Sequence, residues 1–293
     1  MALPDNLKGA AFIVASTAFI SASIICAKAV QDAVLMDAPA LHPLQATWGR
    51  FAFGFLSIFS FSLFRWPGVR GSCWVLHAGR TFCGWSGIAC LFTAVALMRA
   101  ADATAITFLN GLCAMVFAVL FLGERVGIWR WGAAAIAFIG ALVIAQPGTD
   151  AFQWAALVAA GGAMLMGLEV ILIKRLSDGR ESKQRILLIN NAMGACIASV
   201  AVLFVWQWPT PLQWAMLLGA GCFMIGAQTL FLRGLALAEA NLAAPFNYFT
   251  LIFSAFYAFV LFGEVPAITT WAGSALIIAG GLILAWREHV KRP

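Results

Sequence analysis

The chain has 293 residues, of which 63% are hydrophobic and only 10% charged, with a formal net charge of +6 and a mean hydropathy of +0.93. Soluble globular chains are roughly half apolar and a quarter charged, so the surplus apolar surface of this chain must face lipid. These values exclude a soluble enzyme, a secreted disulfide scaffold and a disordered chain.

Ten apolar runs follow one another along the chain, each about long enough to cross the ~30 Å hydrocarbon core of a bilayer. The runs are continuously apolar rather than alternating, which favours helices over the strands of a barrel. The connecting segments are short and leave no room for a soluble domain. The sequence therefore predicts an all-α membrane protein whose ten transmembrane helices lie at residues 10–30, 43–64, 76–97, 103–122, 129–145, 154–173, 186–206, 212–232, 243–262 and 268–286.

Lys and Arg are distributed unevenly between the two sides that these spans define. With a cytoplasmic N-terminus, 15 basic residues fall on the cytoplasmic side and only Arg99 falls outside. This excess is the positive-inside pattern of membrane proteins. We expect a multi-pass protein of the cell inner (plasma) membrane with both termini in the cytoplasm. The basic composition then reflects topology in the lipid bilayer, and no nucleic-acid partner is expected.

The sequence contains an internal repeat. Residues 96–145 align with residues 236–285 at a constant offset of 140, with 13 identities in 50 positions. The identities include the Gly-Glu pairs at 123–124 and 263–264. Because each half then holds five spans, an odd number, the second half must enter the membrane from the opposite side.

The chain is therefore predicted to consist of a first five-helix repeat over residues 1–148 and a second, inverted five-helix repeat over residues 149–293. Inverted repeats are common in secondary transporters, whose substrate site lies near the membrane midplane between the repeats. The fifth and tenth spans carry almost no polar groups and are expected at the periphery. The protein is expected to be a monomer, or a homodimer formed through these spans.

These features resemble the drug/metabolite transporter superfamily, EamA type. The resemblance consists of the ten spans, the doubled five-helix unit, the similar span endings at 122–124 and 262–264, and Arg50 two turns into the second span. The layout is similar to that of amino-acid exporters of the YddG kind. The resemblance implies a secondary transporter that exports small amphipathic metabolites, chiefly amino acids including aromatic and apolar ones, by alternating access. Drugs, nucleotides or sugars are the alternative substrates of the same fold.

A membrane-embedded enzyme and a structural membrane protein are the alternatives from other classes. The sequence holds no Gly-Lys dipeptide and so no P-loop, and no His at membrane depth on which a Ser-His-Asp triad could be built. Its seven Cys include no C-x-x-C pair, and its three His are scattered. We therefore expect no enzymatic activity, no cofactor and no bound metal ion. Buried polar groups would be a cost without benefit in a purely structural protein.

Lys28, Arg50 and Glu169 lie within predicted spans, where charge is costly and usually marks a cavity or pathway. Lys28, near the outer end of the first span, either reaches the interface or contacts substrate. Arg50 lies about 10 Å inside the second span and is expected to meet an anionic substrate group or to fix a helix pair. Glu169 is the candidate for proton coupling, with a structural ion pair as the alternative. Glu124 and Glu264 end their spans and are expected to be caps or loop anchors.

Neutral polar residues form a second set of candidates for substrate binding, namely Asn110, Asn191, Gln228, Asn247 and Tyr248. Amides inside spans also hold helices together, so each has a structural alternative. Trp85 lies in the middle of the third span, whereas ten of the twelve Trp residues lie near span ends. It is either a packed core aromatic or a wall against which an apolar or aromatic substrate group packs.

Overall fold

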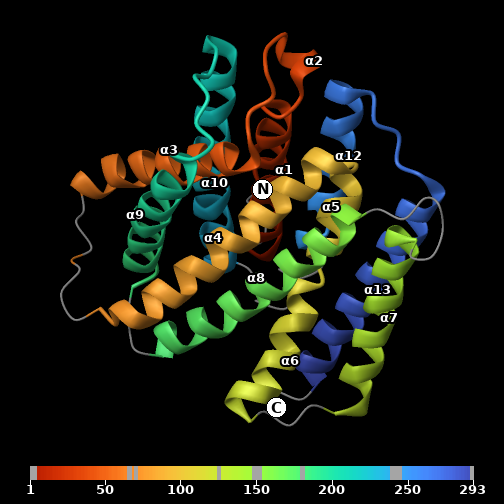
Figure 1. Cartoon of the computed structure of the whole chain (residues 1–293). Coiled ribbons are helices and arrows are strands. Elements are labelled where there is room, and N and C mark those ends of the chain that lie inside the picture. The colour runs from red at the N-terminus through yellow and green to blue at the C-terminus, as the bar shows by residue number, and fades with distance from the viewer. Residues whose placement is uncertain are drawn as a thin grey trace.

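The computed structural model describes residues 5–64, 68, 72–123, 127–146, 154–178, 182–237 and 246–290. These residues form a bundle of helices without a strand (Figure 1). The helices are α1 (Asp5–Ala29), α2 (Ala33–Met36), α3 (Pro43–Phe64), α4 (Trp74–Leu97), α5 (Ala100–Thr107), α6 (Asn110–Leu122), α7 (Ile128–Ala145), α8 (Trp154–Asp178), α9 (Lys183–Val202), α10 (Pro211–Leu237), α12 (Phe249–Phe262) and α13 (Ile268–Val290).

Among the described residues, six helical stretches are long and apolar enough to cross a membrane, namely Lys8–Ala29, Trp74–Leu97, Ala100–Phe121, Trp154–Leu176, Gln184–Val202 and Pro211–Gly234. Three shorter apolar helices lie at Trp131–Ala145, Phe249–Phe262 and Ile268–Gly280. Large apolar side chains such as Phe138, Phe256 and Trp271 are exposed on the outside of the bundle. Because lipid is the solvent that accepts such a surface, the prediction of an all-α membrane protein is confirmed.

The span predicted over 103–122 corresponds to Ala100–Phe121, but it is not one continuous helix, because a turn at Phe108 and Leu109 separates α5 from α6. The second repeat has a turn at Tyr248, which matches Phe108 at the offset of 140 and directly precedes α12. Neither turn itself holds a proline or a glycine, so hydropathy gives no sign of either break. The rings of Phe108 and Tyr248 lie 5.2 Å apart, so the two interrupted helices meet inside the bundle.

The helices of the two repeats interlock instead of forming two separate bundles. α1 packs along α10, and α4 packs along α8, which is the same pairing once the repeats are exchanged. α3 packs on α9, and α7 on α13, so in these two pairs each helix contacts its own counterpart. The helix pairing is therefore related by a pseudo-two-fold arrangement of the two repeats, and most of the packing lies between them.

Glycine lets α7 and α13 approach each other closely at one edge of the bundle (Figure 1). A Cβ added at Gly140 would lie 2.6 Å from the carbonyl oxygen of Gly273, and one at Gly280 would lie 2.6 Å from that of Ala133. These two contacts are equivalent under the offset of 140. Small residues at membrane helix crossings allow this backbone contact. Because the sequence is repeated, the α7–α13 crossing has two such contacts, one at Gly140 and one at Gly280.

We predict that Gly140→Ala lowers the stability of the bundle by about 1–3 kcal/mol, the usual cost of forcing an extra carbon into a packed contact. The reason is that the added methyl group meets a carbonyl oxygen and not a flexible side chain. Thermal unfolding in detergent measures the effect. Gly132→Ala on the same helix is the matched control, because nothing lies within 4 Å of a Cβ at that position. Equal melting temperatures for the two variants would contradict the prediction.

Candidate functional site

A cavity of about 540 Å³ lies in the middle of the bundle between the two repeats. The first repeat contributes residues of α1, α3, α4, α5 and α6, and the second contributes residues of α8, α10, α12 and the turn before α12. Nine of the 20 lining residues are Ile, Leu, Met or Phe. The volume lies within the ~300–1,000 Å³ of typical small-molecule sites.

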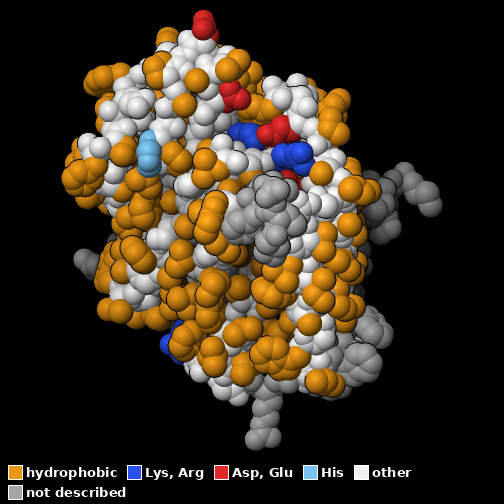
Figure 2. Space-filling view, turned by 45° about the vertical axis from the view of Figure 1, so that its right-hand side comes forward, with side chains coloured by type: hydrophobic (Ala, Val, Ile, Leu, Met, Phe, Trp, Pro, Cys, Tyr) orange, Lys and Arg blue, Asp and Glu red, His pale blue; other side chains and the backbone are white. Residues whose placement is uncertain are grey.

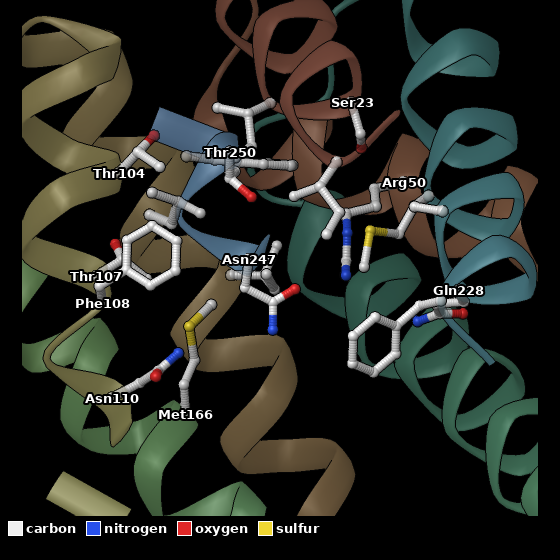
Figure 3. A pocket seen from close by; sticks show the side chains of 18 of the residues that line it. Ser23, Arg50, Thr104, Thr107, Phe108, Asn110, Met166, Gln228, Asn247 and Thr250 are labelled. Atoms are coloured by element: carbon white, nitrogen blue, oxygen red, sulfur yellow. The ribbon is translucent and has the colours of Figure 1, made fainter. Parts of the chain in front are cut away.

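Five of the nine predicted site residues line this cavity, namely Arg50, Asn110, Gln228, Asn247 and Tyr248. Figure 3 shows the Arg50 side chain extending into the cavity on the same side as Gln228, with Asn110 on the opposite side and Asn247 between them. Thr104 and Thr107 add hydroxyl groups beside Phe108. The cavity thus combines apolar walls with a few polar groups from several helices, as ligand sites do.

Arg50 is 8% exposed, and its guanidinium lies 4.7 Å from the centroid of the Phe51 ring, a cation–π contact. Within the described part of the chain it makes no hydrogen bond and no ion pair. The carboxylate of Glu169 interacts with this charge from beyond ion-pair distance. A buried cation that borders a cavity and lacks a direct partner is a candidate contact for an anionic ligand.

Glu169 does not line the cavity but forms an ion pair with Arg80, with 3.4 Å between Oε1 and Nη2. Arg80 also donates a 3.4 Å hydrogen bond from Nη1 to the carbonyl oxygen of Ile186, so it joins α4 to both α8 and α9. Arg80 is one of the 15 basic residues counted on the cytoplasmic side from the sequence, although it falls near the start of the predicted span 76–97. The structure corrects this assignment, because Arg80 lies within α4 and is 5% exposed.

Lys28 also lies outside the cavity lining and forms an ion pair with Glu264. Its Nζ donates a 3.0 Å hydrogen bond to the carbonyl oxygen of Met98 and lies 5.4 Å from the centroid of the Phe262 ring. The other carboxylate oxygen of Glu264 accepts a 3.1 Å hydrogen bond from the backbone N–H of Ala100. Glu264 thus links three segments at this end of the bundle.

Trp85 and Asn191 lie elsewhere in the bundle. Trp85 does not line the cavity, but it lies on α4 only three residues, about 4.5 Å along the helix axis, from the lining residue Ile88. Its buried indole N–H finds no acceptor among the described residues. Asn191 donates a 2.9 Å hydrogen bond to the carbonyl oxygen of Leu187, and its Oδ1 would lie 3.1 Å from a Cβ at Gly54.

The cavity wall is symmetric in position but not in chemistry. Several lining residues are paired by the offset of 140, namely Ile88 with Gln228, Leu91 with Phe231, Thr107 with Asn247, Phe108 with Tyr248, and Asn110 with Thr250. Sequence reasoning missed Thr107, Phe108 and Thr250. Applying the repeat offset to the predicted residues Asn247, Tyr248 and Asn110 would have found them.

A mid-bundle cavity between inverted repeats, bordered by interrupted helices, is the architecture of a secondary transporter. The chain matches the EamA-like transporter family over residues 7–146 and 153–286, and it belongs to this family, within the drug/metabolite transporter superfamily. It is therefore a secondary transporter of small metabolites and not an enzyme.

Several characterised transporters are similar to this chain. It is 31% identical over 220 residues to a riboflavin transporter of Rhizobium johnstonii, covering 74% of this chain and 71% of that protein. An S-adenosylmethionine uptake transporter of Rickettsia bellii is 25% identical over 250 residues, or 85% of each chain. The pseudopaline exporter CntI of Pseudomonas aeruginosa is 26% identical over 200 residues, 68% of this chain and 70% of that one.

A crystal structure with 18% sequence identity superposes on the fold with a TM-score of 0.64 and covers 97% of this chain and 99% of that one. At this level of identity the likeness concerns the fold alone.

We predict that Gly111→Leu blocks the cavity without unfolding the protein. Gly111 lines the cavity, and nothing lies within 4 Å of a Cβ at this position. The new side chain should therefore occupy substrate space, and flux in proteoliposomes should fall for every substrate, most for the largest. Gly132→Leu fills equally open space away from the cavity and should leave flux unchanged. Normal flux in folded Gly111→Leu protein would show that substrate passes elsewhere.

Proposed function

We propose that this transporter exports small amphipathic metabolites that carry an anionic group, with amino acids, aromatic and apolar ones included, as the first candidates. Transport proceeds by alternating access, in which the central cavity opens to one face of the membrane at a time. The observation that carries the proposal is Arg50, a buried cation that borders the cavity and has no direct partner within the described residues.

The charges around the cavity support an anionic substrate. Arg50, Arg80 and Glu169 are two cations and one carboxylate, and the carboxylate is already paired with Arg80. One positive charge therefore remains uncompensated beside the cavity, and a substrate carboxylate would neutralise it. Glu169 stays the candidate for proton coupling, because protonation would release Arg80 and increase the positive charge near the site.

The walls of the cavity support an amphipathic substrate. Phe92, Phe108, Phe231 and Tyr248 offer aromatic surface against which a flat side chain packs. The volume and the relative named for riboflavin favour a second candidate, a larger flat heteroaromatic metabolite without a carboxylate. The relatives include both an uptake transporter and an exporter, so the proposal of export rests on the resemblance to the amino-acid exporters.

We predict that Arg50→Gln lowers the flux of carboxylate substrates roughly tenfold to hundredfold, because a hydrogen bond to a charged group contributes about 1.5–3 kcal/mol. Proteoliposomes would be tested with phenylalanine and with phenylalanine amide, which differ at the carboxylate. Arg50→Lys, which keeps the charge, should retain part of the flux.

Flux of riboflavin serves as the second arm of this experiment. If the protein transports riboflavin but not the amino acids, and Arg50→Gln has little effect on this flux, a flat heteroaromatic metabolite becomes the favoured substrate in place of an amino acid. An equal loss of phenylalanine and phenylalanine amide transport in folded Arg50→Gln protein would contradict recognition of the carboxylate by Arg50.

The orientation we propose places both termini in the cytoplasm, and it is supported by the unequal distribution of basic residues. Reporter fusions after Pro147 and after Pro293, two positions outside the described residues, test it. The fusion after Pro147 should report the outer side, and the fusion after Pro293 should report the cytoplasm. The reverse result would show that the orientation is opposite to the one proposed, and each end of the cavity would then face the other side of the membrane.

A further inference from the structure

Three charged side chains lie together behind the wall of the cavity. Figure 2 shows one face of the molecule, where hydrophobic side chains predominate and most of the charged ones gather toward one end. Arg50, Arg80 and Glu169 come instead from α3, α4 and α8 inside the bundle. Among the described residues, Glu169 is the charged partner of both arginines, at ion-pair distance from Arg80 and further from Arg50. We call these three residues the charge cluster.

The Glu169 carboxylate lies close behind the cavity wall, although it does not line it. A Cβ added at Gly84 on α4 would lie 2.7 Å from this carboxylate, and Gly84 is one helical turn, about 6 Å, from the lining residue Ile88. On α8, Glu169 is three residues, about 4.5 Å, from the lining residue Met166. At this range the carboxylate acts on any charged group that a substrate brings into the cavity.

The ion pair in the charge cluster makes long contacts. The distance from Arg80 Nη2 to Glu169 Oε1 and the distance from Arg80 Nη1 to the carbonyl oxygen of Ile186 are both 3.4 Å. Charge-assisted hydrogen bonds are usually ~2.7–2.9 Å long. Arg80 Nε finds no acceptor among the described residues. The pair is therefore poorly explained as a device that only attaches α4 to α8.

The other repeat contains an equivalent helix crossing. α1 aligns with α8 at an offset of 146, and α4 aligns with α10 at an offset of 140. The packing supports this alignment. Cys26 Sγ lies 3.3 Å from a Cβ added at Gly219. At the equivalent contact, Leu172 Cδ1 lies 3.5 Å from a Cβ added at Gly79.

The equivalent crossing is held without any charge. Under this alignment Glu169 corresponds to Ser23, and Arg80 corresponds to Ala220. The hydroxyl of Ser23, which lines the cavity, donates a 2.7 Å hydrogen bond to the carbonyl oxygen of Ala220. A neutral hydrogen bond is therefore enough to pack these helices. Because charges inside a membrane bundle are costly, the ion pair of the other repeat has to serve a purpose other than packing.

We propose that Arg80 and Glu169 determine the charge of the substrates that the cavity accepts. Together with Arg50 they leave one positive charge, which matches one substrate carboxylate. A second carboxylate on the substrate would be repelled by Glu169, so dianionic metabolites are rejected. Arg80 and Glu169 thus act on specificity through the wall, without touching the substrate. This inference rests on the proposed recognition of an anionic group by Arg50 and limits the substrate to one such group.

The charge of the cavity can be measured without any substrate. Gly111→Cys places a thiol in the lining, where open space surrounds a Cβ. In detergent, the thiol is labelled with an anionic reagent, sulfonatoethyl methanethiosulfonate, and with the cationic trimethylammonioethyl analogue. Both reagents attack the same thiolate, so the ratio of the two rates reports the electrostatic potential and not the ionisation of the thiol. Because the chain holds seven native cysteines, labelling of the same variant with Gly111 retained is subtracted.

Each substitution in the charge cluster should shift the anionic-to-cationic ratio in a defined direction. Glu169→Gln adds one positive charge and should raise the ratio roughly tenfold, the effect of a unit charge across ~10 Å at an effective dielectric constant of ~20. Arg80→Met should lower the ratio by a similar factor. The double variant has the same net charge as the original protein, so its ratio should return to the original value. Asp37→Asn, which removes an exposed carboxylate elsewhere, is the matched control and should change nothing.

A transport experiment tests the consequence for specificity. Phenylalanine and β-phenylaspartate share the ring and the ammonium group and differ by one carboxylate. In proteoliposomes, β-phenylaspartate should move down its gradient roughly tenfold more slowly than phenylalanine, and Glu169→Gln should remove most of this difference. Arg80→Met should slow phenylalanine, because Glu169 is then free to neutralise Arg50. Adding Glu169→Gln to this variant should restore phenylalanine flux, whereas a structural ion pair would not be restored by a second loss.

The two measurements separate this inference from the proposed function. An unchanged labelling ratio in Glu169→Gln would overturn the inference. The same discrimination against β-phenylaspartate with and without Glu169→Gln, in protein that transports phenylalanine, would also overturn it. Shifted ratios in a protein that transports neither acid would overturn the proposed function and support the electrostatic role of the charge cluster. Glu169→Gln and the double variant leave no unpaired carboxylate inside the bundle, so the test does not depend on the folding of Arg80→Met.

Discussion

Close contact between helix backbones at glycine is the constraint on which the rest of this structure depends. Lipid gives helices no hydrophobic reason to associate, so packing and polar contacts must supply the attraction. A Cβ at Gly221 would lie 2.6 Å from the backbone nitrogen of Gly54, and one at Gly162 would lie 3.0 Å from the carbonyl oxygen of Gly87. Because these crossings join helices of opposite repeats, they hold the repeats together and leave the cavity between them.

The two repeats keep equivalent helix contacts, but the side chains at these contacts differ in chemistry. Ser23 donates a 2.7 Å hydrogen bond to the carbonyl oxygen of Ala220. With α1 aligned on α8 at an offset of 146, and α4 on α10 at 140, the equivalent positions in the other repeat are occupied by Glu169 and Arg80. A neutral hydrogen bond on one side of the pseudo-two-fold axis thus corresponds to an ion pair on the other. The positive charge beside the cavity belongs to Arg50, whose counterpart at the offset of 140 is the neutral Asn190, so the polarity of the site is also a departure from the symmetry of the repeats.

Hydropathy was enough to predict helical segments such as residues 43–64, which coincide with α3, because membrane thickness constrains helix length. It missed the turns at Phe108 and Tyr248, since a break inside the bundle leaves the apolar run intact. The candidate residues were selected because charged and polar side chains are costly to bury in lipid. One of them, Arg50, lies in the cavity lining. The same reasoning could not pair Lys28 with Glu264, because depth in the membrane does not reveal which distant side chain lies opposite.

The interlocking of the repeats has a consequence for biosynthesis. The partner of Lys28 is made 236 residues later, which at ~5–20 residues per second leaves α1 in the membrane for about ten to fifty seconds without it. During this time the lysine must reach the interfacial water by extending its side chain along the helix. The nascent first repeat also waits for α8 and α10 to cover its helices. Translation of the second half is thus a step in the assembly of the first, and a chain truncated midway would leave polar groups in lipid for membrane quality control to find.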